Sequence, residues 1–192
     1  FVLPDPLLAP VLAVNIDAAA QRLNDAFDRM ESAGFSGAVN VSIDGQVVIE
    51  RGFGLADRRL SIPNTADTRF QAGAVAKMLT AAAILKLEAQ GRLEVSDPLT
   101  RWFGPLPAPK NRATLHHLLT HSAGLTSSTQ PVYAPDRAAF IDALRRAPSE
   151  YAPGSWQRHT DIGYSALAAV VELASGMPYE EYVRTQLLEP AG

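Results

Sequence analysis

Apolar residues near the start of the chain recur every three or four positions, the spacing at which side chains share one face of an α-helix. Asn15 precedes this stretch and can cap a helix, and Gly34 can end it. We therefore expect a helix over residues 15–33. The apolar positions of its face are Ile16, Ala20, Leu23, Phe27 and Met30.

The next stretch has a period of two, which is typical of a half-buried β-strand. Val39, Val41 and Ile43 alternate with polar residues, and Asp44-Gly45 separates them from a second apolar stretch at 46–54. Asp-Gly favours the tight two-residue turn between antiparallel strands. The pattern therefore predicts a β-hairpin with one face buried, followed by a polar loop over 55–69.

The most apolar helix is predicted over 75–90, where apolar residues occupy nearly every side. Such a helix is usually buried, so we expect it at the centre of the core. A loop around Asp97-Pro98 and a short helix over 114–121, capped by Thr114, are predicted next. The remaining predicted elements are a loop over 122–134, a helix over 135–146, a turn over 152–156, a helix over 161–175 that Asp161 caps, and a last helix from Pro178 to about Leu188.

These elements, about six helices and two strands, predict an α+β fold with an N-terminal hairpin and a helical cluster. A lone hairpin is marginally stable in water. Either the chain is a mostly helical domain with a small hairpin, or the strands that complete the sheet are missing. We expect one domain over residues 1–192, incomplete at its C-terminus.

Composition narrows the possible functions. Of the 192 residues, 47% are hydrophobic and 19% are charged, with a formal net charge of −3. This balance is typical of a globular domain and gives no basic surface for nucleic acid. The absence of cysteine excludes disulfides, thiolate metal ligands and a thiol nucleophile. No apolar run is long enough to predict a membrane span.

The chain begins with Phe1 and not with Met. This indicates removal of upstream residues, either by cleavage of an export signal or by trimming of the chain. We therefore expect a periplasmic or secreted protein, with a cytoplasmic one as the alternative.

Lysine is scarce, which draws attention to each one. Only three of the seventeen basic residues are lysines, at 77, 86 and 110. Lys77 lies in the first turns of the apolar helix, where it either extends to solvent or serves as general base for a hydroxyl on the same face. That hydroxyl would come from three positions earlier, where the chain has Ala74. The residues alone therefore do not form a catalytic pair.

The segment around Lys77 resembles one in the serine β-lactamase and penicillin-binding superfamily, most of all in its branch of class C β-lactamases, esterases and D-alanyl peptidases. The family pattern is Phe, Gly, then Ser-x-x-Lys opening a long helix that exits through Gly-x-Leu-x-Leu-x-Asp-Pro. The residues that match are Phe70, Gly73, Lys77, Gly91, Leu93, Asp97 and Pro98. Stretches 52–57, 115–125, 153–156 and 163–192 resemble further family blocks, so the similarity runs over about 16–192.

The resemblance implies a β-lactamase/transpeptidase-like fold and a serine hydrolase that acts through an acyl-enzyme on β-lactams, D-alanyl peptides or small esters. It places Ala74 at the nucleophile position, Lys77 as general base, and His159 and Asp161 where the family has Tyr-x-Asn. Alanine has no oxygen with which to form an acyl-enzyme, so we expect the chain as written to be inactive. His159 can shuttle protons near neutral pH or be an ordinary loop histidine, with Asp161 only capping the next helix.

The family's third motif, Lys or His followed by x-Gly on a late strand, is absent. The letters HSAG at 121–124 fit it but belong to the block at 115–125. His116, His117 and His121 crowd that block, and the last two could share a metal ion. Because no acidic residue is close in sequence, we interpret all three as core or surface histidines. The serines at 122, 127 and 128 lack a lysine or histidine at the required spacing.

Three hypotheses about function remain. The first is a serine hydrolase that has lost its nucleophile, and the second is a non-catalytic relative that binds a ligand or a protein partner. The third is a fragment that pairs with a second chain carrying the missing strands, because an exposed hairpin edge promotes association. We expect a small-molecule or peptide substrate, and no nucleic acid, metal or cofactor.

Overall fold

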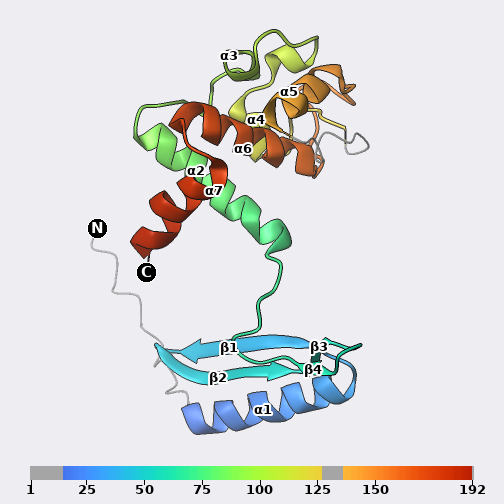
Figure 1. Ribbon diagram of the computed structural model, residues 1–192, viewed down its shortest axis with the longest axis vertical. Coiled ribbons are helices and arrows are strands. Elements are labelled where there is room, and N and C mark those ends of the chain that lie inside the picture. The colour runs from blue at the N-terminus through green and yellow to red at the C-terminus, as the bar shows by residue number, and fades with distance from the viewer. Residues whose placement is uncertain (1–14, 127–135, 192) are drawn as a thin grey trace, which may run out of the picture. The chain divides into compact units, whose positions relative to one another are not determined.

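The protein is described by a computed structural model of residues 15–126 and 136–191. It forms two compact units, residues 1–71 and 72–192, and the expectation of a single domain over 1–192 stays a prediction. The helices and strands are α1 (Ile16–Ser32), β1 (Gly37–Ile43), β2 (Gln46–Phe53), β3 (Leu55–Asp57), β4 (Ile62–Pro63), α2 (Ala76–Ala89), α3 (Leu99–Phe103), α4 (Leu115–Leu119), α5 (Arg137–Arg146), α6 (Asp161–Ser175) and α7 (Tyr179–Val183) (Figure 1).

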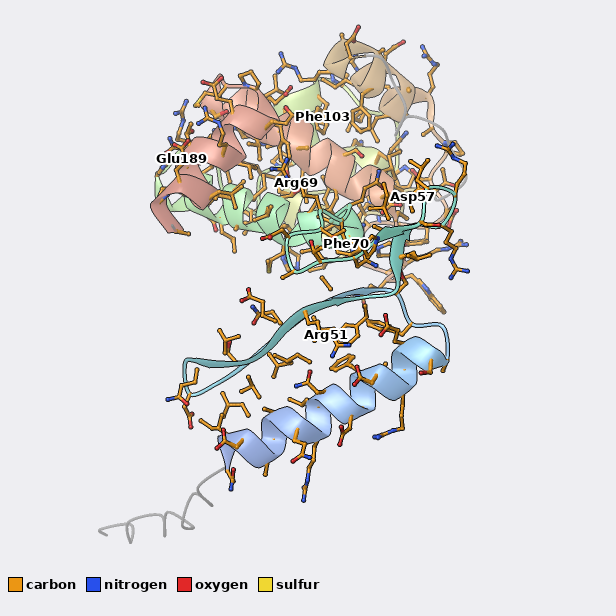
Figure 2. The ribbon with its side chains drawn as sticks, turned by 60° about the horizontal axis from the view of Figure 1, so that its bottom comes forward. Arg51, Asp57, Arg69, Phe70, Phe103 and Glu189 are labelled. Atoms are coloured by element: carbon orange, nitrogen blue, oxygen red, sulfur yellow. The ribbon has the colours of Figure 1, made fainter. Side chains whose placement is uncertain are left out.

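In the first unit, α1 packs against the β1–β2 hairpin. The side chain of Asn15 accepts a hydrogen bond from the amide of Ala18 at 3.0 Å, so the predicted cap is confirmed. Rings from the helix, the connecting segment and the hairpin meet at centroid distances of 5.3–6.0 Å. They belong to Phe27, Phe35 and Phe53. Arg51 reaches from β2 to α1 and pairs with Asp28 at 2.7 Å (Figure 2).

The hairpin turn follows from its two residues. Asp44 and Gly45 have φ values of 50° and 80°, and two positive φ values in a row define the turn whose twist matches that of antiparallel strands. Ile43 pairs with Gln46 directly across it. The predicted hairpin is therefore confirmed in its strands and in its turn.

The expected loop over 55–69 contains a second, very small hairpin instead. β3 pairs antiparallel with β4, and Asn64 anchors the segment that follows. Its Nδ2 atom donates to the carbonyl of Phe53 at 2.8 Å and to Oγ of Ser36 at 2.9 Å. Strands of two and three residues are too short to show a period in the sequence, so the loop prediction was wrong here.

In the second unit, the core forms around α6. Eight of its fifteen residues are buried, whereas α2 buries only four of fourteen. α6 packs against α2, α4 and α7 (Figure 1). Within this unit the expected central position of the helix at 75–90 is therefore wrong. Met78 and Leu85, seven residues apart on one face of α2, are exposed.

The segment between α2 and α4 contains a helix that the sequence pattern did not predict. α3 buries Leu99 and Phe103, and the amide of Leu99 donates to the carbonyl of Ala113 at 2.9 Å. With five residues, α3 spans little more than one turn and shows no apolar period. The predicted helices at 114–121, 135–146 and 161–175 are confirmed as α4, α5 and α6.

The predicted loop over 122–134 lies partly outside the described residues, as do Ser127 and Ser128. The turn at 152–156 is confirmed by a hydrogen bond from the amide of Ser155 to the carbonyl of Ala152 at 3.1 Å. The last helix runs from α7 into a π-helical turn, η4 (Arg184–Leu188). In residues 15–126 and 136–191, no helix is both long and apolar enough to cross a bilayer.

Candidate functional site

Ala74 and Lys77 stand at the start of α2. Ala74 lies in a short 3₁₀ turn, η1 (Gly73–Val75), which runs directly into the helix. Side chains three residues apart along a helix lie on the same face. The Cβ atom of Ala74 and the stem of Lys77 therefore project from the same side of the chain, as the spacing predicted.

The side chain of Lys77 meets Asp161 across the α2–α6 contact. Nζ of Lys77 donates a hydrogen bond to Oδ1 of Asp161 at 2.6 Å. The Lys77 side chain is 20% exposed and the Asp161 side chain 64%, so the lysine is the more enclosed partner. This hydrogen bond lowers the pKa of the Asp161 carboxyl below its usual value and so favours its carboxylate form.

Asp161 does not cap α6, contrary to the simpler interpretation of the sequence. It is the first residue of the helix, and Thr160 occupies the N-cap position without a capping side-chain bond. The carboxylate is turned instead toward α2 and Lys77. Its place in the first turn still suits the helix, because a negative charge is favourable at a helix N-terminus.

His159, two residues before Asp161, belongs to a group of rings beside this ion pair. Its ring lies 4.7 Å from that of His121, and the His121 ring lies 5.1 Å from that of Tyr164. Nζ of Lys77 is 5.9 Å from the Tyr164 ring centre, within reach of a cation–π contact. The structure thus gathers three of the predicted site residues, Lys77, His159 and Asp161, in one place.

His121 belongs to this group, although the sequence analysis interpreted it only as a core or surface histidine and did not single out Tyr164. Its Nδ1 atom accepts a hydrogen bond from the amide of Thr160 at 3.3 Å, and its carbonyl accepts one from the amide of Arg158 at 2.9 Å. Burial lowers the pKa of His121, and the nearby His159 and Lys77 lower it further. A neutral ring is the form whose Nδ1 can accept a hydrogen bond. His121 therefore fixes the segment that carries His159.

A close approach between two segments fixes the same region from the other side. Gly124 has a φ of +72°, and a Cβ atom there would lie 2.1 Å from the carbonyl oxygen of Tyr151. The carbonyl of Gly124 accepts a hydrogen bond from the amide of Glu150 at 2.9 Å. Only glycine fits this crossing, which explains the glycine of the HSAGL stretch. The segment HSAG at 121–124 therefore supports the site by packing closely against residues 150 and 151.

His117 has a structural role of its own. Thr114 caps α4 through its side chain, and Nδ1 of His117 lies 3.1 Å from both the amide and the hydroxyl oxygen of Thr114. Burial lowers the pKa of His117, and the adjacent His116 adds to this effect. Within the described ranges, no group of three or more His, Asp or Glu side chains is placed to hold a metal ion.

The comparison with protein families identifies the family of this chain. A family model described as Beta-lactamase matches residues 23–192. The chain belongs to the β-lactamase family. This match includes both the Ala74–Lys77 segment and the His159–Asp161 segment. The predicted family and its mixed α and β fold are therefore confirmed.

Two curated relatives and one solved structure place the chain within the β-lactamase family. It is 36% identical to Esterase EstB of Burkholderia gladioli, over 94% of this chain and 52% of EstB. It is 29% identical to Penicillin-binding protein 4* of Bacillus subtilis, over 82% of this chain and 37% of that protein. The structure of the octameric penicillin-binding protein homologue from Pyrococcus abyssi matches with a TM-score of 0.75 and 26% identity, over 90% of this chain and 42% of that one.

The chain spans about half the length, or less, of the relatives that it matches. The segments that resemble the family's first two motifs, residues 74–77 and 159–161, lie at the start of α2 and at the start of α6. The finer questions are what the site acts on and what Ala74 does to its chemistry.

Proposed function

We propose that this chain carries an acyl-transfer site for β-lactams, D-alanyl peptides or small esters, and that Ala74 at its nucleophile position stops the reaction before an acyl-enzyme forms. The observation that carries this proposal is the 2.6 Å contact between Lys77 and Asp161. It brings together Lys77 and Asp161, one residue from each of the two segments that resemble family motifs. Relatives named as an esterase and a penicillin-binding protein support the same class of substrate.

The proposed chemistry needs a hydroxyl at position 74. Lys77, as the neutral amine, would take the proton of that hydroxyl while its oxygen attacks the substrate carbonyl. The backbone amide of residue 74 would donate to the oxyanion of the tetrahedral intermediate. As the intermediate collapses, the bond to the leaving group breaks, and the exposed His159 would pass a proton to that group. Water would then attack the acyl-enzyme and release the acid.

With alanine at 74 no bond to the substrate can form at the first step, although the binding surface stays in place. The substitution Ala74→Ser supplies the oxygen, and Ala82→Ser is a matched control because Ala82 is an exposed alanine on the same helix. We expect A74S to hydrolyse a chromogenic cephalosporin or a p-nitrophenyl ester. The unchanged chain and A82S should show only the background rate. Hydrolysis by the unchanged chain would contradict the assigned role of Ala74.

A second candidate function is that of a non-catalytic binding protein. It is favoured by the ion pair itself, because the Lys77 ammonium finds a full charge partner in Asp161 without any hydroxyl at position 74. Removing either partner of such a half-enclosed pair would leave the other charge uncompensated, so the pair can be retained without a catalytic role. If A74S shows no hydrolysis while the chain still binds a β-lactam or a D-alanyl peptide in calorimetry, this second function is the correct one.

A further inference from the structure

Trp156 is an exposed aromatic residue that the site described above does not use. Its side chain stands in the turn before His159, and the residue is 68% exposed. It borders two hollows in the surface of the second unit. The larger, of about 650 Å³, is lined by Glu150, Tyr151, Ser155, Trp156 and Arg158. The smaller, of about 370 Å³, also includes Ser155 and Trp156. The indole of Trp156 therefore lines both hollows.

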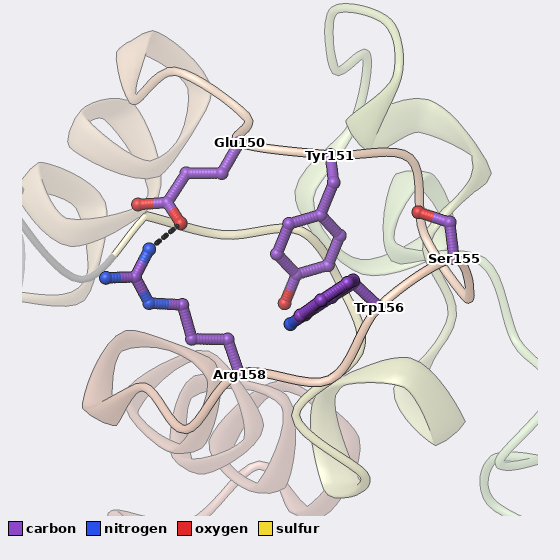
Figure 3. A pocket seen from close by; sticks show the side chains of 5 residues that line it. All are labelled: Glu150, Tyr151, Ser155, Trp156 and Arg158. Atoms are coloured by element: carbon purple, nitrogen blue, oxygen red, sulfur yellow. Dashed lines mark hydrogen bonds and ion pairs between the residues drawn. The ribbon is translucent and has the colours of Figure 1, made fainter.

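The larger hollow combines aromatic walls with an ion pair. Nη1 of Arg158 donates to Oε2 of Glu150 at 2.6 Å, and the rings of Tyr151 and Trp156 face the same space (Figure 3). Because the two charges compensate each other, the hollow has no net charge to attract an ionic ligand. It does offer both kinds of charged hydrogen-bonding group, since a carboxylate accepts and a guanidinium donates.

The smaller hollow continues this mixture beyond the indole. Besides Ser155, its polar side chains are those of His116, Thr120, Ser122 and Gln157. Together they contribute three hydroxyls, an imidazole and an amide, all of which are hydrogen-bonding groups. A ligand long enough to pass over Trp156 would therefore find polar partners on both sides of an apolar platform.

We propose that these two hollows form a carbohydrate-binding site centred on Trp156. A hydroxyl is the neutral group that can donate to the Glu150 carboxylate and accept from the Arg158 guanidinium at the same time. A pyranose with equatorial hydroxyls directs them outward from its edge and leaves its two faces covered by axial C–H groups. Such a face packs on an indole, and the ring edge reaches the polar side chains around it. Two adjoining hollows suit a chain of linked sugars.

This site lies beside the acyl-transfer residues. Tyr151 and Arg158 also line a narrow crevice together with His121 and Thr160. A sugar on Trp156 would thus sit next to the segment that carries His159. The binding step does not rest on the proposed acyl transfer, because it uses neither Ala74 nor Lys77. The two proposals can therefore fail separately.

Intrinsic fluorescence tests the carbohydrate site directly, because the chain has only two tryptophans, Trp102 and Trp156. The probes are β-1,4-linked trisaccharides of glucose and of N-acetylglucosamine, titrated into the unchanged chain. Cyclohexanol is the control ring, since it has the apolar faces but one hydroxyl. We expect a saturable change in emission with a trisaccharide and none with cyclohexanol. Trp102→Phe should keep the change and Trp156→Phe should remove it.

The polar contribution is tested by Glu150→Gln and Arg158→Met. Each is expected to weaken trisaccharide binding about tenfold, the loss of one hydrogen bond to a charged group. Circular dichroism of each variant should match that of the unchanged chain. The proposal is overturned if neither trisaccharide gives a saturable change, or if the change persists in W156F. Saturation by cyclohexanol at the same concentrations would also overturn it, because the hollow would then be a general apolar pocket.

Discussion

Nζ of Lys77 and Oδ1 of Asp161 lie 2.6 Å apart, although the two residues are 84 positions apart in the sequence. This contact joins the first turn of α2 to the first residue of α6. The resemblance to the family pattern Tyr-x-Asn places an asparagine, whose amide is neutral, at position 161. The carboxylate here makes the contact an ion pair, and this difference has a testable effect on any catalysis that a serine at 74 would allow.

Replacing the carboxylate by an amide is expected to speed acylation in the A74S background. Asp161→Asn keeps an oxygen that accepts the hydrogen bond from Lys77 but removes the negative charge of the carboxylate, and a general base accepts a proton through its neutral form. Because Asp161 is largely exposed and screened, we expect an increase of up to about fivefold. The measurement is the acylation rate of A74S and A74S/D161N from pH 6 to 9.

The matched control for this variant is Asp142→Asn in the same background. Asp142 also pairs with a basic residue, Arg146, but on the surface of α5. The Asp142→Asn substitution should leave the acylation rate of A74S unchanged. A slower A74S/D161N with an unchanged pH profile would show that the carboxylate assists the reaction, contrary to this account.

His121 is expected to make the fold less stable in acid. Burial lowers its folded-state pKa below the value of about 6.5 in an unfolded chain. The unfolded state therefore binds the proton more readily, and the stability that neutral His121 contributes is present above about pH 6.5 and lost as the pH falls through the folded pKa. Burial also lowers the pKa of His117, so this residue too is expected to make the fold less stable in acid.

The substitution His121→Asn tests this, because asparagine tolerates the positive φ of 57° at this position. Between pH 7 and pH 5 we expect Tm to fall less in H121N than in the unchanged chain, by about 2–4 °C for each kcal/mol of coupling removed. His116→Asn is the control, since His116 is an exposed neighbour on α4. An equal fall in the unchanged chain and in H121N would exclude His121 as a source of acid sensitivity.

Lys110 is expected to stabilise the end of α5. It is 1% exposed, and its ammonium donates to the carbonyls of Leu144, Arg145 and Ala147. These carbonyls belong to the last turn of the helix and the residue after it, where the helix leaves them without internal partners. Burial lowers the pKa of Lys110.

Lys110→Met should lower the free energy of unfolding by about 2 kcal/mol, because it leaves buried carbonyls without a donor. Lys86→Met is the matched control, since the Lys86 ammonium donates to a single carbonyl, that of Gln186 at 2.5 Å. We expect K86M to cost about half as much, or less. Urea denaturation measures both. Equal costs would mean that the three carbonyls do not depend on Lys110.

The elements that the sequence predicts well are those with long or chemically specific patterns. The first helix has seventeen residues and a capping asparagine, and the hairpin has a turn dipeptide that allows two positive φ values. α3 and the β3–β4 pair were not predicted, because elements of two to five residues show no period in the sequence. The predicted central position of α2 was wrong for another reason. A helix that is apolar on all sides gives no indication of which side its neighbours cover.

The candidate site follows the same division. Lys77 and Ala74 could be predicted because they are three residues apart on one helix, where spacing determines the shared face. The contact with Asp161 could not, because it depends on the packing of α6 on α2. His121 was passed over because its role consists of backbone contacts to residues 158 and 160, which leave no mark in composition. Only the resemblance of its block to the family pointed to that region.

The central claim is that position 74 is the place of the missing nucleophile and that Lys77 would activate it. Intact-mass measurement after incubation with benzylpenicillin tests it most directly, on the unchanged chain, on A74S and on A74S/K77M. We predict one added penicilloyl mass on A74S and none on the other two proteins. An adduct on the unchanged chain, or its absence from folded A74S, would contradict the claim.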